Sequence, residues 1–156
     1  MRPPLHVFVP TNRTYESRGN RGRRAPMDGL NEINRQNRTN RYYGASKERE
    51  NVMWVALFVR RAMREQGYAP MTRDDRRKCH VCITVVEPHD RRDVPNVYGG
   101  VLKYALDALT ARNRHGTGAI WDDNSKWMAL TPKIRIDPDN PGLEITVIAL
   151  EDKDEA

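Results

Sequence analysis

Three groups of aspartates have a spacing that would let them act together on a cation or a phosphate. Asp90 and Asp93 stand in the segment HDRRD, and Asp122 and Asp123 are adjacent in IWDDNSKWM. Adjacent carboxylates repel one another unless a cation lies nearby, and either a divalent metal or an arginine side chain would serve. The third group, in DPDNPG at 137–142, has the composition of an ordinary turn. The sequence therefore offers two candidate acidic clusters.

A predicted helix lies between these two clusters. Asp93 comes just before it, so the carboxylate of Asp93 could also cap the helix N-terminus. Spacings of 4, 3 and 4 residues place four side chains on one predicted face of the helix: Asn96, Gly100, Lys103 and Asp107. Lys103 and Asp107 also have the spacing of a surface ion pair that would contribute little to stability. Functional and structural interpretations of this face both stay open.

The overall charge favours a polyanionic partner. The 156 residues include 27 Lys and Arg against 21 Asp and Glu, a net charge of +6. Arginine, whose planar guanidinium suits phosphate, is the commoner cation. Residues 11–26 are rich in Arg, Gly and Asn without an apolar period, which predicts a flexible basic loop that either contacts DNA or is a disordered insertion. The tail at 151–156 is acidic, so the rest of the chain is more basic than the total implies.

Two further features exclude classes of protein. Cys79 and Cys82 are the only cysteines, and no second C-x-x-C or H-x-x-x-H pattern completes a zinc site. Residues three apart on a strand face opposite sides, so we expect two reduced cysteines. The longest apolar run, 52–59, is far too short to cross a bilayer, and no signal peptide is visible. We therefore expect a cytoplasmic protein without a membrane partner.

Hydrophobic periodicity predicts one domain over residues 1–156, of the α/β (α+β) class, with a mixed β-sheet and two main helices packed on it. The predicted strands are 5–9, 79–87, 133–137 and 144–150, and the predicted helices are 45–66, with Gly67 as its C-cap, and 96–111. The apolar positions that should face the core are Val52, Val55, Val59 and Met63 in the first helix and Val97, Val101, Ala105 and Ala108 in the second.

Three segments taken together resemble a known family. RRDVPN at 91–96, KYALDAL at 103–109 and WDDNSKWM at 121–128 resemble the RusA family of Holliday junction resolvases. In that family an R-x-D-x-D-N segment, a helix with Lys and D-A-L, and a D-D pair follow one another. GLNEINRQNRTNRYYG at 29–44 and IRIDPDNPGLEITV at 134–147 are also similar to family segments, so the resemblance covers about residues 27–150.

The resemblance implies a RusA-like homodimer, of phage or bacterial setting, that cleaves four-way and other branched DNA during recombination and repair. It implies Mg²⁺, for which Mn²⁺ can substitute, held by Asp93, Asp122 and Asp123 and by Asp90 if that residue swings in. Asp93, Asp123 and Lys103 would be the catalytic residues, the lysine steadying negative charge that develops on the phosphate. We expect DNA contacts from Arg38, Arg41, Arg91, Arg92, Asn96 and Lys126.

Pro95 departs from the family pattern. It stands where the family has its second aspartate, and proline offers neither a ligand atom nor a backbone N–H. Either Asp90 replaces the missing acid, or Asp93 and Asp123 hold a single metal with waters, or the protein binds branched DNA without cutting it. A basic protein associated with RNA or the ribosome, whose acids are only surface charges, is the alternative from another class.

Overall fold

A mixed four-stranded sheet is built from the two ends and the middle of the chain. The computed structural model describes residues 2–11, 14–17, 20–23, 27, 34–35, 37–38 and 41–151 (backbone only at 14–17, 20–23, 41 and 43). The strands are β1 (Leu5–Pro10), β2 (Thr14–Ser17), β3 (Asn20–Arg23), β4 (Cys79–Glu87), β5 (Met128–Ile136) and β6 (Gly142–Ala149). The sheet has the order β1-β6-β4-β5, in which only the β4–β5 pair is parallel.

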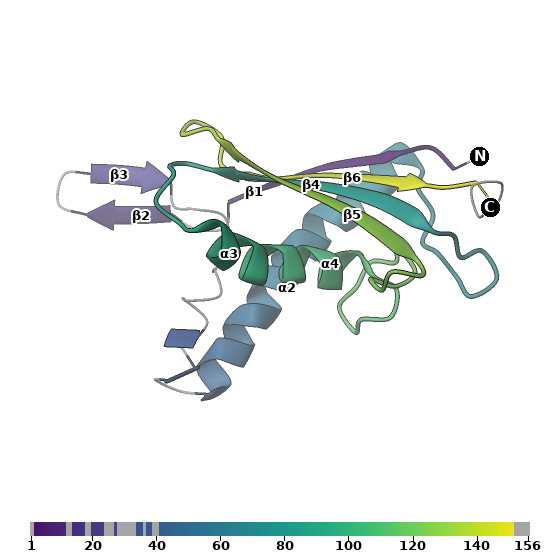
Figure 1. Ribbon diagram of the computed structural model, residues 1–156, viewed down its shortest axis with the longest axis horizontal. Coiled ribbons are helices and arrows are strands. Elements are labelled where there is room, and N and C mark those ends of the chain that lie inside the picture. The colour runs from purple at the N-terminus through teal and green to yellow at the C-terminus, as the bar shows by residue number, and fades with distance from the viewer. Residues whose placement is uncertain are drawn as a thin grey trace.

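The helices lie on one side of this sheet (Figure 1). They are α2 (Arg41–Gln66), α3 (Val94–Val97) and α4 (Lys103–Leu109), the last two joined by a π-helical turn at Tyr98–Leu102. The sheet and its covering helices confirm the predicted α+β class. All the apolar positions expected to face the core are buried.

The end of α2 shows how the sequence determines a boundary. Gly67 has φ 66°, a left-handed conformation that costs glycine nothing. The backbone N–H of Gly67 donates to Arg64 and that of Tyr68 to Met63, which is the Schellman pattern of helix termination. The buried Tyr68 ring then packs into the core. The predicted C-cap is therefore confirmed.

Three predicted segments differ in the structure. The loop predicted at 11–26 contains a hairpin in which β2 and β3 pair antiparallel, because local backbone hydrogen bonds order such a segment without an apolar period. The second helix is interrupted by the π-helical turn, and β5 begins five residues earlier than expected because it pairs along the whole of β4. Of the acidic tail, only Glu151 lies within the described residues, and it is exposed.

The cysteines and the helices bear on two predictions from the sequence, that the cysteines are reduced and that no segment crosses a membrane. Cys79 and Cys82 are both free; Cys79 is buried, whereas Cys82 is half-buried on the other face of β4. Burial raises the pKa of the Cys79 thiol to about 11, so this cysteine stays protonated and unreactive at neutral pH. Among the helices that the structure describes, none is both long and apolar enough to span a membrane.

Candidate acidic cluster and nucleic-acid interface

The crossover from β4 to β5 sets the distance between the two predicted acidic clusters. Because the strands are parallel, Cys79 pairs with Met128 and Glu87 with Ile136. Asp93 follows the Glu87 end of the sheet, whereas the loop 121–127 precedes β5 at the Cys79 end. The helical run from α3 to α4 spans the sheet between them (Figure 1).

The two predicted clusters therefore do not meet within one chain. Fourteen residues separate Asp93 from Asp107, or about 20 Å at the rise of an α-helix. A metal centre shared by Asp93 and Asp123 of the same chain, as the sequence analysis expects, is not assembled in this structure.

At the N-terminal end of the run, Arg92 is part of the fold. Its guanidinium donates to the carboxylate of Glu87 at 2.8 Å and to the carbonyl oxygen of Met27 at 2.9 Å. The side chains of Arg92 and Glu87 are only 9% and 3% exposed, so the predicted DNA contact of Arg92 is replaced by a buried ion pair. This ion pair ties the loop before α3 to the end of β4 and to the segment at Met27.

The neighbours of Arg92 are more accessible. Asp90, Arg91 and Asp93 are exposed, and Asn96 is half-buried. Asp93 occupies the N-cap position of α3, but its side chain makes no capping hydrogen bond. Pro95 fits the first turn of α3, where a missing N–H breaks no helical hydrogen bond. Pro95 therefore suits the helix start, and Asp93 remains available to a ligand.

A second group of charges forms where α4 faces the loop 121–127. Burial, the largest cause, raises the pKa of Asp107 above the usual value for an aspartate. The ammonium group of Lys103 lowers this pKa, and the nearby carboxylates of Asp123 and Glu48 raise it. These four residues, which we call the Asp107 cluster, come from α2, α4 and the loop.

Asp122 and Asp123 have different roles in their loop. One carboxylate oxygen of Asp122 accepts from the backbone N–H of Asp123 at 2.9 Å, and the other accepts from the Asn124 amide at 2.8 Å. Arg112 lies 3.5 Å from the same carboxylate. The arginine partner considered from the sequence is therefore present for Asp122, which shapes the turn, whereas the side chain of Asp123 is left exposed.

The Asp107 cluster fits a divalent cation only in part. Within the part of the chain that the structure describes, no group of three or more His, Cys, Asp or Glu side chains is arranged to hold a metal ion. Mg²⁺, however, commonly uses one or two protein carboxylates and completes its octahedron with waters and substrate phosphates. Asp107 and Asp123 would satisfy that smaller requirement, with Lys103 beside them.

Cationic and aromatic side chains lie next to the loop 121–127. The guanidinium carbon of Arg76 is 5.0 Å from the ring centroid of Trp127 and 5.9 Å from that of Trp121. The ammonium nitrogen of Lys126, a predicted DNA contact, is also 5.0 Å from the Trp127 centroid. Arg76 and Lys126 are both exposed.

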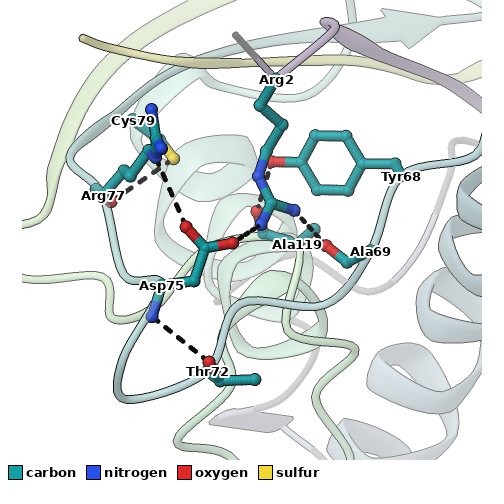
Figure 2. A network of polar contacts seen from close by, with 8 residues as sticks. All are labelled: Arg2, Tyr68, Ala69, Thr72, Asp75, Arg77, Cys79 and Ala119. Atoms are coloured by element: carbon teal, nitrogen blue, oxygen red, sulfur yellow. Dashed lines mark hydrogen bonds and ion pairs between the residues drawn. The ribbon is translucent and has the colours of Figure 1, made fainter.

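A polar network holds the loop that carries Arg76 (Figure 2). Arg2 donates to the Asp75 carboxylate at 2.6 Å and to the carbonyl oxygen of Ala69, and its guanidinium lies over the Tyr68 ring. Asp75 also pairs with Arg77 at 3.5 Å. The chain on both sides of Arg76 is thus anchored to other parts of the fold.

The remaining predicted DNA contacts belong to the segment before α2 and its first turn. Arg38 is exposed, and the side chain of Arg41 lies outside the described residues.

The sequence did not reveal two members of the site, Glu48 and Arg76, because neither belongs to a motif. Asp107 was identified on the polar face and as the aspartate of D-A-L, four residues after Lys103, but it was not among the predicted site residues.

Comparison of the chain with protein-family models, with curated proteins and with solved structures finds no match. The RusA resemblance therefore stands on the motif residues alone.

Proposed function

We propose that this protein is a DNA-binding, Mg²⁺-dependent endodeoxyribonuclease of branched DNA, with the Asp107 cluster at its centre. One observation carries the proposal: Asp107 lies near enough to Lys103, of the same RusA-like motif, and to Asp123, of another, for both charges to act on its pKa. A raised carboxylate pKa beside a second carboxylate and a lysine is typical of a site that awaits a cation. The four-way junction and the homodimer remain predictions from the resemblance, and the cytoplasmic location remains a prediction from the sequence.

The residues of the cluster divide the chemistry between them. Asp107 and Asp123 would hold Mg²⁺, which when bound polarises the phosphodiester and supplies a nucleophile at neutral pH. Lys103 lies close enough to Asp107 to offset part of its charge, and its exposed ammonium group can donate a hydrogen bond to a phosphate oxygen. The carboxylate of Glu48 adds negative charge near the proposed Mg²⁺ site but need not bind the ion.

A cleavage assay tests this proposal. A four-way DNA junction is incubated with the full chain, with Asp123→Asn and with the matched control Asp74→Asn, each with Mg²⁺ and with EDTA. Asp74 is exposed and belongs to no motif. We expect cleavage only with Mg²⁺, a fall on the order of 100-fold in Asp123→Asn, and no change in the control. Equal cleavage by wild type and Asp123→Asn would refute the site.

A second candidate function is binding of branched DNA without cleavage. It is favoured by Pro95 in place of the family aspartate and by the incomplete set of ligands among the described residues. An inert wild type that binds the junction in both Mg²⁺ and EDTA would establish this alternative. Preference for RNA over junction DNA in the same binding assay would contradict both candidates.

A further inference from the structure

The most unusual charged surface outside the Asp107 cluster is formed by Arg76, Lys126, Trp121 and Trp127. Several cations in the described part of the chain have carboxylate partners: Arg2 and Arg77 with Asp75, Lys47 with Glu50, Arg61 with Glu65, Arg92 with Glu87, Arg112 with Asp122 and Arg135 with Glu144. Arg76 and Lys126 instead lie over indole rings.

A carboxylate partner and an indole partner have different effects on the charge of a cation. A carboxylate neutralises the cation that it holds, whereas an indole face attracts a cation through its quadrupole and leaves the net charge in place. Arg76 and Lys126 are therefore held in position while each retains a full positive charge toward solvent. Such a pair has the properties needed to receive an anion.

Hydrogen bonds hold the backbone at both tryptophans. The Trp127 carbonyl accepts from the N–H of Cys79 at 2.9 Å, and the Trp127 N–H donates to the carbonyl of Asn124 at 3.0 Å. The Trp121 carbonyl accepts from the hydroxyl of Thr110 at 3.1 Å. Arg76 reaches Trp127 from a different loop, which the network around Asp75 holds in place. The two loops that carry these side chains are thus tied to the rest of the fold.

We infer that Arg76, held over Trp121 and Trp127, and Lys126, held over Trp127, form a clamp for backbone phosphates of DNA next to the loop that carries Asp123. The inference deepens the proposed function and rests on it for the identity of the polyanion. Guanidinium and ammonium groups are the common phosphate ligands, and the guanidinium can donate two hydrogen bonds to one phosphate. Because Lys126 and Trp127 share a loop with Asp123, the clamp would hold the strand close to the proposed site of cleavage.

The salt dependence of binding tests this clamp. We would measure the Kd of the full chain for a four-way DNA junction in EDTA between 50 and 200 mM NaCl. Each lost phosphate contact reduces the slope of log K against log salt by about 0.9. Arg76→Gln and Lys126→Gln should each show that reduction, with a several-fold weaker Kd at the lower salt, and the double variant should show about twice the reduction.

Matched variants separate a clamp from a general loss of charge. Lys133→Gln removes one exposed cation from β5, on a sheet face away from the helices, and should change the slope by less than half as much. Trp127→Leu keeps both cations but removes their platform and should weaken binding several-fold, whereas Trp127→Phe should restore most of the affinity. If Trp127→Leu does not fold, Arg76→Gln and Lys126→Gln, both at exposed positions, still test whether the clamp binds phosphate.

The outcomes also separate the clamp from the nuclease. Slope changes as expected together with an inert wild type in Mg²⁺ would support the clamp and refute cleavage. A slope unchanged in the double variant, or an equal loss in Lys133→Gln, would overturn the clamp even if the protein cuts DNA. A wild type that does not bind the junction at 50 mM NaCl would overturn both.

Discussion

The two ends of the helical run Val94–Leu109 use their charged side chains in different ways. At the N-terminal end, the ion pair of Arg92 and Glu87 is almost wholly buried, and the guanidinium holds one oxygen of the carboxylate. At the C-terminal end, burial is the largest cause that raises the pKa of Asp107, and the carboxylate of Asp123 raises it further, against the opposing effect of Lys103. A buried ion pair maintains a structure, whereas a partly buried carboxylate with a raised pKa beside other charged groups is characteristic of a binding site.

The parallel crossover also explains why two RusA-like segments that flank one helix in the sequence lie apart in the fold. RRDVPN and WDDNSKWM flank the same helix in sequence, so a single centre near both was expected. A parallel crossover, however, places the residues before a helix and those after it at opposite ends of the sheet. The half of the motif whose charges act on one another is the one in which Lys103 and Asp123 influence the pKa of Asp107.

The largest expected effect is on stability at the N-terminal end. Arg92→Met would leave the buried Glu87 carboxylate without its main cation, which typically costs about 3–5 kcal/mol of unfolding free energy. Urea denaturation followed by circular dichroism measures the change. Arg91→Met, one residue away and exposed, is the control and should lie within about 0.5 kcal/mol of wild type. Similar losses in the two variants would mean that the buried pair has no special role.

We expect substitutions at the two ends of the helical run to differ in their effect on DNA cleavage. Asp107→Asn should lower the rate of junction cleavage in Mg²⁺ on the order of 100-fold, because it removes one of two proposed cation ligands. Asp93→Asn should lower it by far less, and Pro95→Asp, which restores the family acid beside Asp93, should bring no gain. The opposite ranking, with Pro95→Asp more active than wild type, would place the active centre at the N-terminal end.

Much of the fold could be predicted because its signals are local. The stripe of Val55 and Val59, the glycine that ends α2 and the apolar run of β4 each determine a short stretch of structure. The π-helical turn and the hairpin of β2 and β3 were missed, since both depend on backbone hydrogen bonds that leave no apolar pattern.

The candidate site was only half predictable for a related reason. Asp122, Asp123 and Lys103 belong to recognisable motifs, whereas Glu48 and Arg76 enter only through the tertiary fold. No spacing in the sequence relates the start of α2 to the end of α4, although the two helices pack together. The different roles of Asp122 and Asp123 likewise follow from hydrogen bonds within the turn, which the letters DD do not specify.

A smaller effect is expected on the pH dependence of stability at the C-terminal end. Because the folded pKa of Asp107 is raised, its contribution to stability is present below the ordinary aspartate pKa and is lost as the pH rises through the raised value. Asp107→Asn should therefore stabilise the protein by about 0.5 kcal/mol at pH 7 while lowering activity, and the gain should vanish near pH 3. Thermal unfolding at both pH values measures this gain.

Added Mg²⁺ should raise the Tm of the wild-type protein more than that of Asp107→Asn. Equal shifts of Tm in the two proteins would argue against cation binding at Asp107.

The smallest effect concerns the loop that brings Arg76 to the C-terminal end. The hydrogen bond and charge of Arg2 lower the pKa of Asp75, so the contribution of this ion pair is present above the ordinary aspartate pKa and is lost as the pH falls through the lowered one. Because the Asp75 side chain is 54% exposed, water screens the pair, and Asp75→Asn should lower the Tm only slightly at pH 7. The difference from wild type should close as the pH is lowered. A deficit that persisted in acid would mean that the uncharged hydrogen bonds of this network, rather than its charges, hold the Arg76 loop in place.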